Sequence, residues 1–351
     1  MNTIRWLVDK HLDNQKSYPQ LAEAAQFLQQ NDVVAFPTET VYGLGGNACS
    51  SDAVAKIFAA KGRPADNPLI VHIASYPQLD GIVADISDKS KQLMDAFWPG
   101  PLTIIFQKKE GAVSDLVTAG LDSVAVRMPD HPVALALIKE SGLPIAAPSA
   151  NRSGKPSPTT ANHVMEDLDG RIAGVVDGGQ TGVGVESTVI DCRGEHPIIL
   201  RPGGITKEAI EAIIDKVEMS TSVVDKEEKP QAPGMKYTHY APSAPLYLVE
   251  GTPEWVQSVV NEKTKSGMRV GVMAASETVN EYDAHTVLDC GSRSDLASVA
   301  HRLYDVLRKF DETDVDVIFS EVFPEEGVGV AIMNRLDKAA GHKWLRQINH
   351  S

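Results

Sequence analysis

The sequence lacks the features that mark several common protein classes. Its 351 residues include only three cysteines, Cys49, Cys192 and Cys290, which lie far apart, without a C-x-x-C pair or a histidine at metal-ligand spacing. A disulfide framework and a structural zinc site are therefore not expected. No apolar run approaches ~18 residues, and the first residues lack the apolar stretch of a signal peptide. We therefore expect a cytoplasmic protein with no membrane association.

Positive charge is also scarce. There are 33 Lys and Arg residues against 47 Asp and Glu residues, which gives a formal net charge of −14. A field of this sign repels polyanions, so no stable nucleic-acid binding is expected. Any anion that the protein binds must be held by a local cluster of basic side chains or backbone N–H groups. Small phosphates fit this requirement better than a nucleic-acid duplex does.

The familiar nucleotide and catalytic motifs are missing as well. The chain contains neither G-x-x-x-x-G-K-[ST] nor G-x-G-x-x-G, and neither G-x-S-x-G nor H-E-x-x-H. A nucleotide would therefore have to be held by another arrangement of donors.

The pattern of apolar residues predicts two α/β domains. Residues 1–215 combine short apolar strands with helices, and their irregular Gly-rich connections predict a sheet that is only partly parallel. Residues 216–243 contain a polar, charged stretch that indicates a linker. Residues 244–351 alternate strands with helices, which favours a smaller Rossmann-like domain. Strands are expected at 33–36, 69–73, 102–106, 124–126, 144–147, 174–176, 188–191, 198–200, 246–249, 269–273, 285–288 and 315–319, and helices at 18–30, 51–60, 87–97, 132–141, 206–214, 253–263 and 295–311.

The segment 37–46, PTETVYGLGG, follows one of these strands and precedes a predicted helix. Ligands of open α/β sheets bind at the carboxyl ends of strands, where glycines allow close approach and Thr hydroxyls can donate hydrogen bonds. An ordinary strand–turn–helix connection would have the same pattern.

A second segment, 61–72, reads KGRPADNPLIVH. Lys61 and Arg63 flank a glycine at the end of a predicted helix and could bind phosphate, although cations at this position also complement the helix dipole. His72 ends the next strand and is compatible with a buried structural histidine. Arg127 likewise ends a strand, where it could instead form a structural salt bridge.

Three further segments carry polar groups beside glycines or prolines. Residues 147–159, APSANRSGKPSPT, could present Ser and Asn donors to a ribose or phosphate, or could be a solvated loop. The other two, 186–189 (ESTV) and 200–204 (LRPGG), lie at strand ends. Arg201 in the latter could be a simple surface residue.

Taken in order, these segments resemble the long, two-domain form of the threonylcarbamoyl-AMP synthase family, a YrdC-like domain joined to a C-terminal α/β domain. The match includes VAVRMPDH at 124–131 and APGMKYTHYAP at 232–242, and runs along nearly the whole chain. The resemblance implies a twisted mixed-sheet domain with a concave basic cavity. It also implies a nucleotidyltransferase that converts L-threonine, bicarbonate and ATP into threonylcarbamoyl-adenylate, pyrophosphate and water. The product would serve the modification of tRNAs that read ANN codons.

The resemblance also assigns roles to individual residues. The threonine would be surrounded by Thr40, His72, Arg127 and Ser187, with its carboxylate on Arg127. Catalytic roles would fall to Lys61 and Arg63. The ATP site would comprise Lys61, Arg63, Asn67, Ser123, Ala147 (through its backbone only), Ser149, Ser157, Arg201 and Tyr240. Tyr240 belongs to the linker 216–243, which would close over the nucleotide as a lid.

The chemistry agrees with such a site. A carbamate that attacks the α-phosphorus of ATP brings two anions together, so cations must offset their repulsion, and no nucleophilic side chain is needed. Mg²⁺ would enter with ATP, bound through phosphate oxygens and water, which leaves its protein ligands undefined in the sequence. A downstream tRNA threonylcarbamoyl transferase would receive the product.

Two other functions are compatible with parts of this pattern. One is an RNA-binding module for tRNA or double-stranded RNA without catalysis, which the net negative charge disfavours. The other is carbamoyl transfer in cofactor maturation, but the zinc-finger-like cysteines that accompany this domain type in larger proteins are missing. The sequence leaves the oligomeric state and the identity of the transferase undetermined.

Overall fold

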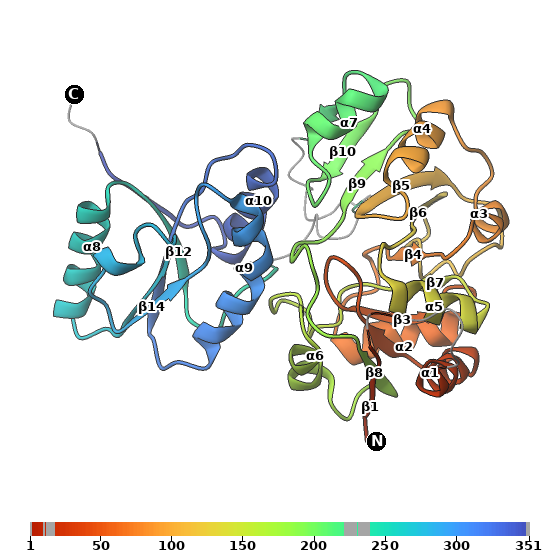
Figure 1. Cartoon of the computed structure of the whole chain (residues 1–351), viewed down its shortest axis with the longest axis horizontal. Helices are drawn as coiled ribbons and strands as arrows, with labels where there is room; N and C mark the ends of the chain where they lie inside the picture. Colours follow the sequence, from red (N-terminus) through yellow and green to blue (C-terminus); the bar gives the residue numbers. More distant parts are fainter. Residues whose placement is uncertain (1, 10, 12–17, 221–229, 231–238, 349–351) are drawn as a thin grey trace. The chain divides into compact units, whose positions relative to one another are not determined.

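The computed structural model describes residues 2–9, 11, 18–220, 230 and 239–348. The chain divides into two compact units (Figure 1). Unit 1 comprises residues 1–153 and 157–237, and unit 2 comprises residues 154–156 and 238–351. The predicted mixed α/β class and the smaller parallel domain are both confirmed, and each unit has its own sheet.

Unit 1 is built on one mixed sheet of eleven strands among the described residues, in the order β1-β8-β2-β3-β7-β4-β6-β5-β9-β10-β11. Five of the neighbouring pairs are parallel and five are antiparallel. The strands are β1 (Ile4–Leu7), β2 (Val34–Phe36), β3 (Gly43–Asn47), β4 (Ile70–His72), β5 (Leu102–Gln107), β6 (Ser123–Arg127), β7 (Ile145–Ala146), β8 (Gly174–Asp177), β9 (Thr188–Asp191), β10 (Ile198–Arg201) and β11 (Glu218–Met219).

Helix α2 (Ser51–Lys61) begins and ends at residues with clear capping chemistry. The Ser50 side chain accepts a hydrogen bond from Ala53 N at the start of α2, and Gly62 ends this helix in the left-handed region at φ 64°. Lys61 is thereby the last residue of the helix. The helices of unit 1 are α1 (Pro19–Gln29), α2 (Ser51–Lys61), α3 (Tyr76–Ile82), α4 (Asp88–Phe97), α5 (Pro132–Ser141), α6 (Ala161–Leu168) and α7 (Lys207–Ile214).

The parallel pair of β4 and β6 positions the polar residues of the sequence motifs. The register pairs Ile70 with Ala125 and His72 with Arg127. Both strands are buried along their whole length, as expected for strands with neighbours on both sides. His72 and Arg127 therefore lie side by side at the carboxyl ends of β4 and β6.

Unit 2 has a five-stranded sheet in the order β14-β13-β15-β12-β16, and all its pairs are parallel. Helix α8 covers one face, and α9 and α10 cover the other (Figure 1). The strands are β12 (Leu246–Glu250), β13 (Val270–Ala274), β14 (Thr286–Asp289), β15 (Val317–Glu321) and β16 (Trp344–Arg346), and the helices are α8 (Pro253–Lys265), the 3-10 helix η1 (Val279–Glu281), α9 (Leu296–Asp311) and α10 (Gly329–Ala339).

Several elements were not predicted, and β3 is the most informative of them. The sequence predicts no strand in the segment 37–46, which is also compatible with an ordinary strand–turn–helix connection. In the structure its last residues pair with β2 as an antiparallel strand. The glycines of β3 hid it, because Gly has low strand propensity. A Cβ on Gly45 would lie 2.7 Å from Phe36 Cε1 and 2.8 Å from Ile145 Cγ2, so close packing excludes a side chain there. The other elements missed are β1, β11, β16, α3, α6, η1 and α10, and β11 lies within the stretch interpreted as a linker.

Gly203 provides a test of how the two strand-end motifs pack. A Cβ at this position would lie 2.3 Å from Glu186 O and 2.4 Å from Thr188 N, which are backbone atoms that cannot rotate away. We expect Gly203→Ala to lower the free energy of unfolding by about 1–3 kcal/mol in chemical denaturation. Gly81→Ala is the control, since a Cβ there meets nothing within 4 Å and Gly81 lies in α3. Equal stability of the two variants would contradict this packing.

Candidate active site

The loop between β2 and β3 presents a rigid pair of hydroxyl groups. Thr38 Oγ1 donates to Val41 O at 2.7 Å and accepts from Thr40 N at 3.1 Å. The hydroxyls of Thr38 and Thr40 are 2.8 Å apart. Both threonines are buried, so the loop holds Thr40 in one orientation.

Arg127 carries its charge into this buried region. Its side chain is only 4% exposed, yet Nη2 lies 2.5 Å from Glu39 Oε2, Nη1 donates to Thr40 Oγ1 at 3.1 Å and Nε donates to Gly100 O at 3.3 Å. A buried guanidinium is costly unless such partners compensate the lost hydration. The contacts with Glu39 and Thr40 hold the β2–β3 loop at the end of β6, so Thr40 and Arg127, both predicted to bind threonine, lie together.

His72 is the neighbour of Arg127 across β4 and β6 and is 3% exposed. Burial, and secondly the positive charge of Arg127, lower the pKa of His72 to about 3. The ring is therefore neutral near pH 7. Its Nδ1 lies 3.2 Å from Ile70 O, and since a carbonyl oxygen can only accept, Nδ1 carries the proton in this contact. His72 thus adds no charge to the site.

Ser187 and Arg201 form a second buried contact, next to β9. Arg201 donates from Nη2 to Ser187 O at 2.9 Å and to Ser187 Oγ at 3.2 Å. The Ser187 hydroxyl also lies 2.8 Å from Thr103 Oγ1, on β5. This arrangement joins the two predicted motifs ESTV and LRPGG. Arg201 is therefore buried and is not a surface residue.

Lys61 is buried at 2% exposure beneath the loop that follows β7. Its ammonium group donates to the carbonyl oxygens of Ser149 and Asn151, the latter at 2.7 Å. In turn, Ser153 N donates to Lys61 O at 2.9 Å. Lys61 therefore does more than complement the dipole of α2, because it fixes the backbone of the 149–151 segment.

Three predicted ATP-binding residues lie toward the other end of β4 and β6. Arg63 is half-buried and donates from Nη2 to Pro68 O at 3.3 Å, while Asn67 is 1% exposed. Ser123 is the first residue of β6, whereas Arg127 is the last, so the strand separates the two by roughly 13 Å at 3.3 Å per residue. The structure thus does not bring Ser123 into contact with the Arg127 cluster.

The serine-rich loop connects to the ESTV motif through another buried contact. Ser157 Oγ donates to Glu186 Oε1 at 2.6 Å, and Ser157 is fully buried. Ala147 N donates to Ile70 O at 2.9 Å, so its N–H group is used within the sheet, and its backbone role toward ATP stays a prediction. Ser149 bridges to Gly43 across the sheet. This loop is therefore part of the folded core of the site and is not a solvated turn.

Tyr240 lies in unit 2 at 5% exposure, with a positive φ of 66°. Its ring stacks on Tyr304 at 5.2 Å, and the Arg335 guanidinium lies 5.8 Å from its centroid. Most of the segment expected to act as a lid, residues 221–229 and 231–238, lies outside the described residues. The role of Tyr240 toward ATP stays a prediction.

Sequence reasoning missed three residues of this region: Glu39, Thr103 and Glu186. Glu39 was inside a quoted motif, but a lone acidic residue in a threonine-rich loop is usually solvated. Its contact with Arg127 depends on two segments 88 positions apart, and no local pattern indicates it. Thr103 could have been suspected only as a polar residue inside an apolar strand.

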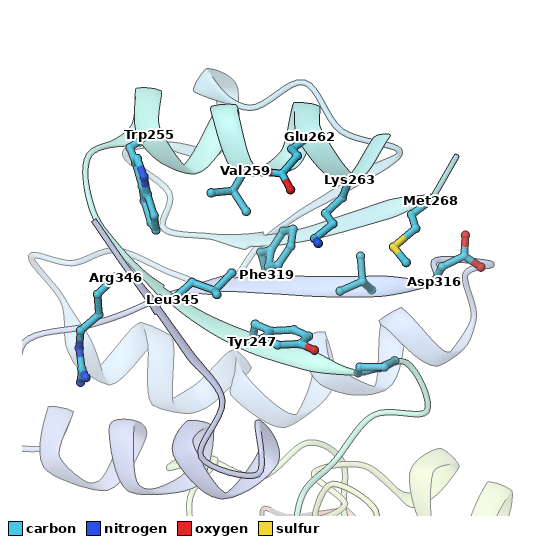
Figure 2. Close-up of a pocket in the computed structure, with 12 residues that line it drawn as sticks. Tyr247, Trp255, Val259, Glu262, Lys263, Met268, Asp316, Phe319, Leu345 and Arg346 are labelled. Atoms are coloured by element: carbon cyan, nitrogen blue, oxygen red, sulfur yellow. The ribbon is translucent and has the colours of Figure 1, made fainter. Parts of the chain in front are cut away.

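A separate cavity of about 360 Å³ lies in unit 2, on the sheet face that α8 covers (Figure 2). Its floor carries the rings of Tyr247 and Phe319, and Trp255 closes one side. The charged groups at its rim include Asp316, which is paired with Arg269, and Arg346, which is paired with Glu250. The buried polar residues of the motifs described above lie in unit 1 instead, so unit 1 is the candidate active site.

Among the described residues, no group of three or more His, Cys, Asp or Glu residues could hold a metal ion. In the same part of the chain, no helix has the length and apolar character needed to cross a membrane.

Comparison with known proteins identifies both halves of the chain. A family model described as telomere recombination matches residues 26–203, and one described as the threonylcarbamoyl-AMP synthase C-terminal domain matches residues 205–341. The chain is 59% identical to a threonylcarbamoyl-AMP synthase of Bacillus subtilis, covering 99% of this chain and 100% of that protein. It is 49% identical to the synthase of Pyrococcus abyssi, covering 92% and 94%.

A solved structure agrees with these matches. The crystal structure of Pyrococcus abyssi Sua5 complexed with L-threonine has a TM-score of 0.92 and 46% sequence identity, and the match covers 99% of this chain and 100% of that chain. The similarity therefore includes both units and not the YrdC-like fold alone. On this basis, the chain belongs to the threonylcarbamoyl-AMP synthase family, in its long form with two domains.

Proposed function

We propose that this chain converts L-threonine, bicarbonate and ATP into L-threonylcarbamoyl-adenylate, pyrophosphate and water. The main support for this proposal is Arg127, because it places a buried positive charge against the Thr40 hydroxyl and beside neutral His72. Such an arrangement of charge and hydroxyl suits a small polar anion with a hydroxyl group, and L-threonine is the ligand of the similar solved structure. The product would supply the threonylcarbamoyl group for tRNAs that read ANN codons, through a separate transferase.

The side chains would act by positioning and by charge. Arg127 would bind the threonine carboxylate, while Lys61 and Arg63 would offset the repulsion between the carbamate and the triphosphate. Lys61 supports this role because its charge is buried at the loop 149–151. Charge would build up on the leaving pyrophosphate, and preorganised cations in a dry site stabilise it strongly. No covalent intermediate with the protein is required.

Mg²⁺ would enter as a complex with ATP. Because the described residues hold no cluster of metal ligands, the ion would be bound chiefly by phosphate oxygens and water, as Mg²⁺ commonly is. It would neutralise part of the triphosphate charge. The enzyme class that follows is a nucleotidyltransferase, since AMP is transferred to the carbamate.

Removal of the Arg63 side chain tests whether this residue contacts the phosphates of ATP. We expect Arg63→Ala to lower kcat/KM for pyrophosphate release by a factor equivalent to about 2–4 kcal/mol, because a charge-assisted contact to phosphate is lost. Lys91→Ala is the control, since Lys91 is an exposed cation on α4. Release should depend on threonine and bicarbonate and should need no RNA. Similar small losses in both variants would contradict the assignment.

Activity with different amino acids tests whether the site recognises the hydroxyl group of threonine. Valine replaces the threonine hydroxyl with a methyl group, which cannot form the hydrogen bond that the site would make to that hydroxyl, so we expect a loss of ~10⁴-fold or more in kcat/KM. Serine lacks only the methyl group and should lose roughly 10–200-fold. Steady-state pyrophosphate assays with the three amino acids measure both ratios. Turnover of valine close to that of threonine would show that the hydroxyl is not recognised.

A further inference from the structure

Glu39 is an acidic residue at a site that otherwise collects positive charge. Its carboxylate is 13% exposed and lies 2.5 Å from Arg127 Nη2. The angles of this ion pair do not meet those of a hydrogen bond, and both carboxylate oxygens are buried without a hydrogen-bond donor among the described residues. A buried carboxylate in this state is costly, because ionised groups need hydrogen bonds to replace hydration.

The backbone on either side of this carboxylate is held firmly. Glu39 O accepts from Gly182 N at 3.1 Å and from Val183 N at 2.7 Å, and Thr40 O accepts from Gly184 N at 3.2 Å. These three bonds tie the β2–β3 loop to the segment before β9. Glu39 therefore stays beside Arg127 because its backbone is fixed, even though the carboxylate lacks donors of its own.

A free α-amino acid carries one negative and one positive group, which are the partners that Arg127 and Glu39 respectively require. Its carboxylate can bind a guanidinium, and its ammonium group supplies N–H donors to a carboxylate. A ligand with both groups would therefore satisfy Arg127 and Glu39 together, and it would replace one poorly aligned ion pair with two charge-assisted contacts.

We propose that Glu39 binds the α-ammonium group of the incoming threonine, so that Arg127 and Glu39 together recognise the amino acid as a zwitterion. This inference rests on the proposed function and assigns a substrate-binding role to a residue outside the set predicted from the sequence. Once the nitrogen becomes a carbamate, its positive charge is gone and the contact with Glu39 no longer attracts it. Glu39 thus favours the free amino acid over its N-acylated form.

The experiment compares the binding of two ligands to the wild type and to three variants. L-Threonine carries the ammonium group, whereas N-acetyl-L-threonine keeps the carboxylate and the hydroxyl but has a neutral nitrogen. Isothermal titration without ATP gives the Kd of each ligand for the wild type, Glu39→Gln and Glu39→Asp. Glu208→Gln on α7 is the matched control, because it removes the same charge from an exposed position of unit 1.

We expect Glu39→Gln to weaken threonine binding by roughly 10–100-fold, the range for a hydrogen bond to a charged group. Binding of N-acetyl-L-threonine should stay the same or become tighter, because the carboxylate that competes for Arg127 has been removed. This ligand also reports that the variant is folded. Glu39→Asp should recover part of the preference for threonine, and Glu208→Gln should leave both Kd values unchanged.

Two results would overturn the inference. If Glu39 only occupies Arg127 until the substrate arrives, Glu39→Gln will bind threonine more tightly than the wild type does. If Glu39 only supports the loop, both ligands will weaken equally and their ratio will not change. In either case, wild-type pyrophosphate release would leave the proposed function standing. A wild type that binds no threonine and releases no pyrophosphate would contradict the proposed function as well.

Discussion

The guanidinium of Arg127 is buried, and the segments at one end of the unit 1 sheet supply the oxygen atoms that compensate its lost hydration. Burial of a guanidinium is unfavourable unless carboxylate, hydroxyl and carbonyl oxygens replace its hydration. Glu39, Thr40 and Gly100 supply one of each. These partners come from the β2–β3 loop and from the turn before β5, so their contacts with Arg127 hold three separate segments at one end of the sheet.

The same solution recurs at two other buried cations of unit 1. Lys61 donates to carbonyl oxygens of the loop after β7, and Arg201 donates to Ser187 at the start of β9. In each case the cation binds oxygen atoms of a segment far away in the chain, so the contact that compensates its lost hydration also fixes that segment. The partners of Arg127 include a carboxylate, that of Glu39.

Unit 2 follows a different plan. Its sheet is entirely parallel, and one face is covered by α8 alone, which leaves the aromatic cavity open beside Tyr247 and Phe319 (Figure 2). The residues that line this cavity combine aromatic and aliphatic side chains with charged groups such as Asp316 and Arg346. The family match extends through this unit, so a second parallel domain is a regular part of the long form.

The sequence by itself determined the class of the fold, most of its strands and helices, and the motifs of the site. Apolar periodicity and capping residues such as Ser50 and Gly62 act locally, so a single sequence carries them. The tertiary structure alone decided β3 and the contact of Ser157 with Glu186. It also decided that Glu39 faces Arg127. These features depend on strand register and on segments far apart in the chain, where packing and desolvation outweigh local preference.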